Sequence, residues 1–188
     1  MQLNMKQVED SEILEKFSNE KTRNEAFSLL IEKYRQKIYW HIRRLVIDHD
    51  DADDLVQEVF IKVWKNLSNF RKDSQLYTWL YRIATNECIT FLNKKKQKNN
   101  ISIDEDVSSY LTNSLVEGSY FNGDKAQMKL QKALLTLPDK QRLVFNMKYF
   151  DDLKYEEISE ILGTSVGGLK ASFHLAVKKI ERYLLNTD

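Results

Sequence analysis

The segment DHDDADDLVQEVFIKVW, residues 48–64, carries the clearest structural pattern in the sequence. Its apolar residues recur every three or four positions, as they do on one face of an α-helix. They are Ala52, Leu55, Val56, Val59, Phe60 and Val63. Carboxylates crowd the first turns, where they meet the positive end of the helix dipole and can accept hydrogen bonds from unpaired N–H groups. The stretch therefore predicts a helix that begins near Asp48 and buries one face.

The opposite face of this helix is not explained by capping. It carries two acids, an amide and an apolar residue: Asp54, Gln57, Glu58 and Ile61. Such a surface suits a protein partner and repels phosphate. An ordinary solvated face is the alternative, because single exposed apolar residues are common on proteins. This stretch alone leaves the two interpretations evenly balanced.

The composition predicts an all-α protein. A chain of 188 residues suits one domain or two small ones, and 42% apolar with 30% charged residues is typical of soluble globular proteins. Five glycines, a single proline and long runs of helix-favouring residues argue against a sheet, which needs more turns. Cys88 is the only cysteine, so the chain cannot form an intrachain disulfide.

No segment of the sequence looks like a signal peptide, and no run approaches the roughly 18 apolar residues that a membrane span needs. We therefore expect a cytoplasmic protein without membrane insertion. The net charge of +1 argues against bulk electrostatic binding to nucleic acid. Charges are nevertheless segregated, since residues 48–58 hold six carboxylates and no Lys or Arg, while basic residues cluster at 94–98 and 170–182. Separate surfaces for a protein and for an anionic polymer are expected.

The chain divides into two helical units and a linker. Residues 1–93 are expected to hold helices at 4–19, 24–47 and 48–64, and another that begins near Leu76. Residues 94–125 are polar, rich in Asn and Ser and without a sustained period, which predicts a flexible linker. A flexible chain of that length averages roughly 30 Å from end to end. It would tether the two units without fixing a distance between them.

An aromatic and basic segment follows the 48–64 stretch. Its rings are Phe70, Tyr77, Trp79, Tyr81 and Phe91. They lie in sequence beside Arg71, Lys72, Arg82 and the lysines at 94–98. This mixture is typical of single-strand nucleic-acid binding, in which bases stack on rings and cations follow the backbone. The alternative is that these rings belong to the core, which is favoured for Trp79 and evenly balanced for Tyr77 and Tyr81.

The last unit, residues 126–188, has the pattern of a helix-turn-helix. We expect helices at 126–135, 139–149 and 155–162, then a turn at Gly163 and Thr164, and Ser165 as the cap of a long final helix. In this motif the N-terminal part of the second helix enters the major groove of DNA. An αα-hairpin in an interaction domain would show a similar period, so that alternative stays open.

Three motifs in this order resemble bacterial RNA polymerase sigma factors of the extracytoplasmic-function (ECF) group, over nearly the whole chain. They are DDADDLVQEVFIKVW, FRKDSQLYTWLYRIATNECITFL and LPDKQRLVFNMKYFDDLKYEEISEILGTSVGGLKASFHLAVKKI. The resemblance implies two small helical domains. Residues 1–93 would bind core polymerase and recognise and melt the promoter's minus-10 element, 94–125 would be the linker, and 126–188 would read the minus-35 element.

The resemblance also implies roles for individual residues. The first motif would dock on the clamp helices of the polymerase's largest subunit through Asp54, Leu55, Gln57, Glu58, Ile61 and Trp64. The second would hold the melted minus-10 strand, with one base flipped into a pocket, through Phe70, Arg71, Lys72, Asp73, Ser74, Tyr77, Trp79, Arg82 and Asn86. The third would contact minus-35 DNA through Gly168, Lys170, Ala171, Ser172, His174, Leu175 and Lys178.

The final helix departs from the family pattern. Many members read SVGTVKSRLHRAR where this chain reads SVGGLKASFHLAV, so that Ser172, Leu175 and Val177 replace three arginines. Arg is the commonest reader of guanine. We therefore expect weaker or differently specific minus-35 contacts, including apolar contact to thymine methyl groups.

The resemblance implies core RNA polymerase, promoter DNA and an anti-sigma factor as partners. We expect no enzyme activity, cofactor or metal, because the sequence shows no nucleophile–base pair or phosphate loop and no metal-ligand spacing among His41, His49 and Cys88. The alternative is a helix-turn-helix regulator that acts without polymerase, usually as a dimer on a palindrome. That alternative leaves the acidic face of 48–64 unexplained.

Overall fold

The computed structural model describes residues 8–71, 74–98, 111 and 125–186, and the regular structure in these ranges is entirely helical. This confirms the predicted all-α class. The first unit contains α1 (Asp10–Ser18), α2 (Arg23–Val46), α3 (His49–Asn66), the short turn η1 (Leu67–Asn69) and α4 (Leu76–Lys98). The second contains α6 (Lys125–Leu135), α7 (Asp139–Phe145), the π-helical turn η3 (Asn146–Phe150), α8 (Tyr155–Leu162) and α9 (Val166–Asn186).

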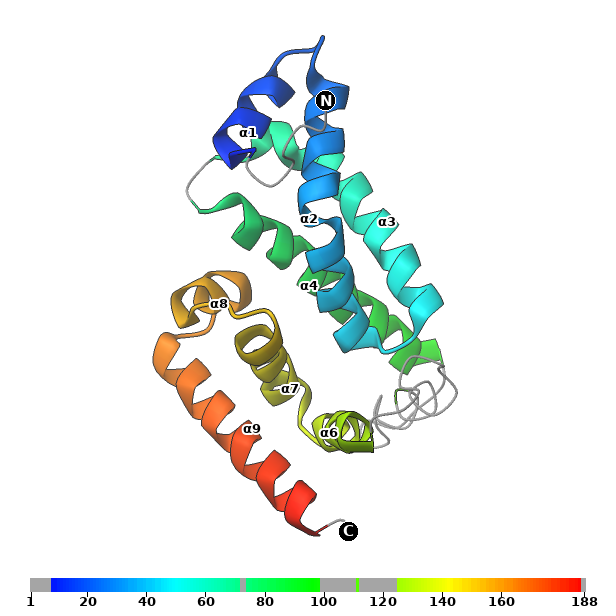
Figure 1. The fold of residues 1–188 in the computed structure, drawn as a ribbon, viewed down its shortest axis with the longest axis vertical. Helices are drawn as coiled ribbons and strands as arrows, with labels where there is room; N and C mark the ends of the chain where they lie inside the picture. Colours follow the sequence, from blue (N-terminus) through cyan, green and yellow to red (C-terminus); the bar gives the residue numbers. More distant parts are fainter. Residues whose placement is uncertain (1–7, 72–73, 99–110, 112–124, 187–188) are drawn as a thin grey trace.

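The first unit is a bundle of α2, α3 and α4, with α1 packed on α2 (Figure 1). The reversal between α2 and α3 is tight. Ile47 takes a positive φ of 66° and donates its N–H to Arg43 O at 2.9 Å, after which Asp48 caps α3 by accepting from Asp51 N at 3.0 Å. The predicted cap at Asp48 is confirmed. A positive φ is costly for a β-branched residue, and Ile47 is held there because its side chain is buried.

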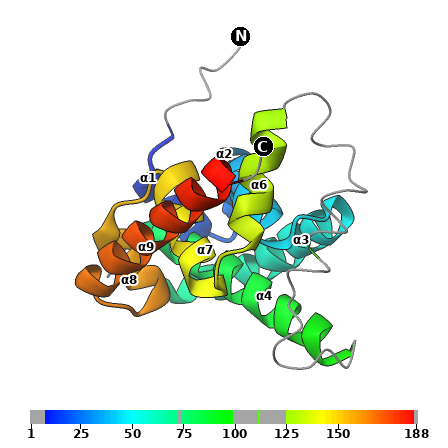
Figure 2. The same ribbon diagram turned by 90° about the horizontal axis from the view of Figure 1, so that it is seen from below.

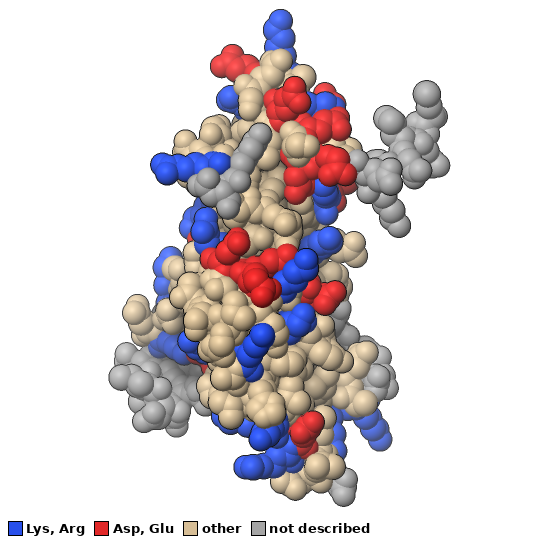
Figure 3. Space-filling view, turned by 90° about the vertical axis from the view of Figure 1, so that its left-hand side faces the viewer, with Lys and Arg blue, Asp and Glu red and all other residues tan. Residues whose placement is uncertain are grey.

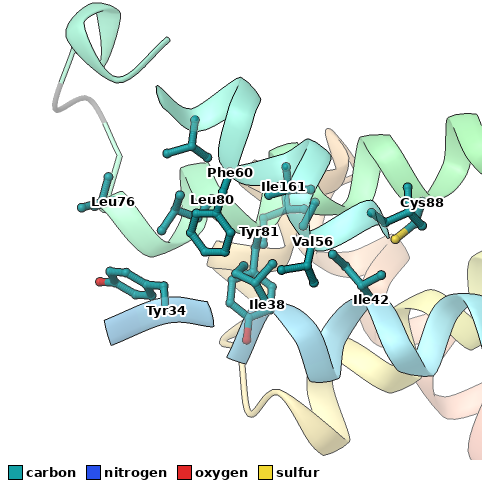
Figure 4. Packing of buried hydrophobic residues seen from close by; sticks show 14 of the residues in the cluster. Tyr34, Ile38, Ile42, Val56, Phe60, Leu76, Leu80, Tyr81, Cys88 and Ile161 are labelled. Atoms are coloured by element: carbon teal, nitrogen blue, oxygen red, sulfur yellow. The ribbon is translucent and has the colours of Figure 1, made fainter. Parts of the chain in front are cut away.

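Every apolar residue predicted for the buried face of α3 is in the core. Figure 4 shows Val56 and Phe60 among Ile38 and Ile42 of α2 and Leu80 of α4. The same cluster continues without a break into the second unit. Its members from there are Val144, Met147, Leu153, Ile158, Ile161 and Leu169.

The two units therefore pack against each other, with α8 beside α4 (Figures 1 and 2). The linker predicted at 94–125 leaves the separation of the two units undefined, whereas the structure shows them in contact. The patterns in sequence cannot show such packing, because an apolar helix face looks the same whichever unit covers it.

Two boundaries differ from those expected. α4 continues to Lys98, five residues into the predicted linker, because lysine is a good helix former and because Lys95 and Lys96 pair with Asp51 and Asp139. The helix expected at 139–149 ends at Phe145 and continues as η3. Between Lys98 and Lys125 the structure describes only Leu111, which is fully buried against Ile47 and Leu135.

The second unit has the predicted helix-turn-helix. Gly163 ends α8 in a left-handed conformation with φ 61° and donates to Ser159 O at 2.9 Å. Ser165 Oγ then accepts from Gly168 N at 3.3 Å at the start of α9. Glycine suits the left-handed position because it has no Cβ. Among the described residues, no helix is both long and apolar enough to cross a membrane.

Candidate polymerase and nucleic-acid interfaces

The exposed side of α3 is the first candidate interface. Five of the six residues assigned to polymerase are exposed there: Asp54, Gln57, Glu58, Ile61 and Trp64. We call these five the α3 face. Ile61 is 54% exposed and Trp64 is 37% exposed, which are large values for such apolar side chains. The sixth residue, Leu55, is 3% exposed and lies in the core, so its side chain supports the α3 face from beneath.

The charged and aromatic members of the α3 face differ in how they are held. Trp64 meets Phe27 and Phe17 edge to face, at ring-centroid distances of 4.9 and 5.4 Å, so the indole is fixed on α1 and α2. Asp54 and Glu58 make no ion pair within the described ranges. Asp51, by contrast, pairs with Lys95 at 2.6 Å. The carboxylates of the α3 face are therefore available to a partner.

The segment assigned to the minus-10 element spans the end of η1 and the start of α4. Arg71, Arg82 and Asn86 are exposed, while Phe70, Ser74, Tyr77 and Trp79 are half-buried. Lys72 and Asp73 lie outside the described residues. The rings of Phe70 and Trp79 are 5.4 Å apart and both pack on the core, which agrees with the core interpretation favoured for Trp79. The segment thus offers an aromatic pair flanked by exposed cationic and amide groups.

The two tyrosines of α4 have different surroundings. Tyr81 is 4% exposed and belongs to the core, where burial and the nearby Asp151 carboxylate raise the pKa of its phenol. Tyr77 is half-buried, and its hydroxyl donates to Glu157 Oε1 of α8. The question that the sequence left open is therefore decided for Tyr81, and Tyr77 contacts the second unit.

The outer side of α9 is the third candidate interface. Lys170, Ala171, His174, Leu175 and Lys178 are exposed, and Gly168 and Ser172 are half-buried. A Cβ at Gly168 would lie 3.3 Å from Ser165 Oγ and 3.4 Å from Thr164 Cγ2, so the helix-turn-helix itself favours glycine at this position. Lys and Arg side chains dominate the lower end of the face in Figure 3, where α9 ends, whereas acidic groups gather higher up.

Sequence reasoning missed several residues at these sites. Ala176 is fully buried under α9, at a position where alanine is too weakly apolar to mark a face. Three further residues, His41, Arg44 and Asp151, join the two units through an ion pair of Asp151 with Arg44 and a hydrogen bond between Asp151 and His41. All three are polar, and Asp151 lies 110 residues from His41 and 107 from Arg44, so no spacing rule connects it with them. Among the residues that the structure describes, no group of three or more metal-binding side chains occurs.

Comparisons with known proteins give the two units separate matches. The family described as Sigma-70 region 2 matches residues 30–98, and the one described as Sigma-70, region 4 matches residues 127–180. The ECF RNA polymerase sigma factor SigW of Bacillus subtilis is 32% identical over 167 residues, which cover 85% of this chain and 89% of that protein. The RNA polymerase sigma-H factor of Pseudomonas aeruginosa is 31% identical over 194 residues, with 95% of each chain covered.

Solved structures share the fold. The sigma factor RpoE from Bartonella quintana, in complex with the anti-sigma factor NepR, superposes with a TM-score of 0.69 and 22% identity over 86% of this chain and 98% of that one. CnrH, in complex with the cytosolic domain of CnrY, gives 0.66 and 19% over 94% and 96%. The family matches and the relatives similar in sequence do not favour a regulator that acts without polymerase. Two family matches in order, and relatives that are similar over nearly their full length, show that this chain belongs to the ECF RNA polymerase sigma factors.

Proposed function

We propose that the α3 face binds core RNA polymerase at the clamp helices of its largest subunit. The observation that carries this proposal is a helix with one face completely buried and the other exposing Glu58, Ile61 and Trp64 together. Carboxylates repel DNA phosphates, whereas exposed Ile and Trp gain from burial against protein. Because Phe17 and Phe27 already fix Trp64, its ordering costs little conformational entropy on binding.

The segment from Phe70 to Asn86 would recognise and melt the minus-10 element. Its exposed Arg71, Arg82 and Asn86 suit a single strand, since cations follow phosphates and an amide can bond base edges. Extruding a base costs a few kcal/mol, which stacking and edge hydrogen bonds in a protein pocket can offset. The Phe70–Trp79 pair supplies aromatic surface beside these groups.

The exposed side of α9 would read the minus-35 element. Lys170 and Lys178 suit phosphates, and Ala171 and Leu175 suit thymine methyl groups. With a net charge of +1, the chain by itself should bind duplex DNA weakly. Polymerase would therefore supply much of the affinity for the promoter.

The remaining roles follow from this assignment. A protein that works through polymerase needs no catalytic chemistry of its own, and it would act in the cytoplasm with that enzyme. The solved relatives RpoE and CnrH are bound to NepR and to CnrY. Their complexes support the proposal that an anti-sigma factor binds this chain too.

Co-elution with core RNA polymerase tests the proposal. The unmodified protein should co-elute, and the double variant Gln57→Ala with Glu58→Ala should lose at least about tenfold in affinity, as central interface residues do. The matched control is Gln97→Ala with Glu181→Ala, the same residue types at exposed sites on α4 and α9. Lack of association, or equal loss in both variants, would refute the role of the α3 face.

A further inference from the structure

The turn between η3 and α8 reaches into the first unit. The Asp151 carboxylate is 3% exposed, with Oδ1 2.6 Å from Arg44 Nη1 and Oδ2 2.7 Å from His41 Nδ1. His41 is fully buried, and its Nε2 lies 2.9 Å from Thr85 Oγ1 of α4. Because a carboxylate only accepts hydrogen bonds, Nδ1 of His41 carries a proton. One acidic side chain of the second unit is thus bonded to α2 directly and linked through His41 to α4.

Irregular backbone aims Asp151 at this site. Asp151 N donates to Asn146 O at 3.2 Å, the wide spacing of a π-helical turn, and Leu153 N donates to Met147 O at 3.1 Å. Between them, Asp152 takes a left-handed conformation with φ 53°. Asp is among the residues that tolerate this conformation best. Departures of this kind tend to occur where a side chain has a specific task.

The contacts of Asp151 with His41 and Arg44 stabilise the packing of the two units, and they exist only while the units are together. Separation would take Asp151 away from the Arg44 guanidinium and leave His41 Nδ1 without its hydrogen-bond acceptor. Removing one partner of a buried ion pair is much more unfavourable than the net value of the pair suggests, because the other charge is left uncompensated. The guanidinium of Arg44 also lies 4.9 Å from the ring centroid of Phe150, and this cation–π contact reinforces its position beside Asp151.

A second contact between the units involves the proposed minus-10 segment. The hydroxyl of Tyr77 is bonded to Glu157, whose other oxygen accepts from Lys154 N at 2.7 Å at the start of α8. With α8 packed on α4, the two DNA-reading units are side by side. Promoter elements about seventeen base pairs apart are separated by roughly 60 Å, at 3.4 Å per pair. We call the arrangement with the two units packed together the closed form. In the closed form the protein cannot occupy both promoter elements.

We propose that the contacts of Asp151 with His41 and Arg44 hold the two units of the free protein together. We call these contacts the latch. The proposal rests on the proposed promoter-binding function, because it describes how access to the minus-10 segment is regulated. Binding to polymerase and promoter must release Asp151 and free Tyr77. Weakening the latch shifts the free chain toward the open form.

Cys88 provides a built-in reporter for opening. It is fully buried, and burial raises the pKa of its thiol. With Arg142, Leu143 and Leu162 of the second unit it lines a cavity of about 370 Å³ at the junction. As the only cysteine in the chain it gives a single signal. Separation of the units opens this cavity and exposes the thiol to a disulfide reagent such as Ellman's reagent.

The test compares thiol reaction rates of the full-length chain without polymerase. Asp151→Asn should react about tenfold faster or more than the unmodified protein, the change expected when a charged hydrogen bond is lost. Asp152→Asn removes the same charge from the next residue, whose side chain is 97% exposed, and should leave the rate unchanged. Arg44→Gln should also accelerate the reaction, and the double variant should show less than the sum of the two effects.

Circular dichroism separates opening from unfolding. If Asp151→Asn loses helical content, Arg44→Gln replaces it in the test. The Arg44 side chain is 22% exposed, so its substitution is tolerated more easily. If the latch variants that remain folded react with the disulfide reagent at the same rate as Asp152→Asn, the proposed latch is refuted. Because the measurement uses the free chain, a failure to bind polymerase would count against the proposed function and leave the latch result intact.

Discussion

Lys95 Nζ lies 2.6 Å from Asp51 Oδ2, so the end of α4 is tied to the first turn of α3. The same ammonium lies 4.8 Å from the ring centroid of Phe91. An acidic residue of the 48–64 stretch thus has a partner within the protein. The pair also explains why α4 stays helical beyond residue 93.

Replacing Lys95 should destabilise the first unit slightly. We expect Lys95→Ala to lower the free energy of unfolding by about 0.5 to 1 kcal/mol, because both side chains are partly exposed and water screens the pair. Urea unfolding gives the value. Lys94→Ala, at an exposed neighbouring site, is the control. Equal effects in the two variants would show that the ion pair contributes nothing.

Variants of Leu55 and Gln57 should distinguish a residue that supports α3 from within the core from one that contacts polymerase. Leu55→Ala removes a core side chain and should cost about 2 to 5 kcal/mol in folding free energy. Gln57→Ala, at an exposed site, should change stability by less than about 0.5 kcal/mol while it weakens polymerase binding. Thermal unfolding measures both stabilities. If Gln57→Ala were the less stable of the two variants, the burial described for α3 would be contradicted.

Tyr34 should make the protein sensitive to alkali. Burial, and a hydrogen bond from its hydroxyl to Asp10 at 2.7 Å, raise the pKa of Tyr34 above its ordinary value of about 10. The folded state therefore holds this proton more tightly than the unfolded chain does. The resulting stability is complete below pH 10 and is lost as the pH rises further.

Tyr34→Phe should consequently flatten the decline of unfolding free energy above pH 10. Below that pH the variant should be less stable by about 1 kcal/mol, since it loses one hydrogen bond. Tyr149→Phe, at a 60% exposed site, serves for comparison. An unchanged alkaline slope in Tyr34→Phe would mean that the Tyr34 hydroxyl is not held buried beside Asp10 in solution.

Arg82 tests the melting segment without disturbing the core. It is exposed on α4, so Arg82→Ala should keep the stability within about 0.5 kcal/mol. With holoenzyme on a promoter, permanganate should modify fewer thymines near the minus-10 element, because a contact to the melted strand is gone. Arg35→Ala, an exposed arginine of α2, should leave the footprint unchanged. Identical footprints for the two variants would refute the assignment.

Sequence periodicity predicted the buried face of α3, the cap at Asp48 and the turn at Gly163, because each depends on residues within one or two helical turns. It could not predict the contact between His41 and Asp151, which are 110 residues apart in sequence and are both polar. The resemblance assigns Leu55 to the polymerase interface, although its place in the apolar period predicts that it lies in the core. A family motif carries supporting and contacting residues alike.

The proposed role in promoter-specific initiation can be measured by in vitro transcription of genomic DNA from the source bacterium, with start sites read by sequencing. Core polymerase with this protein should produce start sites that core polymerase alone does not. Those sites should share one minus-10 sequence and a second element about seventeen base pairs upstream, roughly 60 Å along the duplex. If the protein adds no start sites, or adds sites without a common sequence, it does not direct promoter-specific initiation.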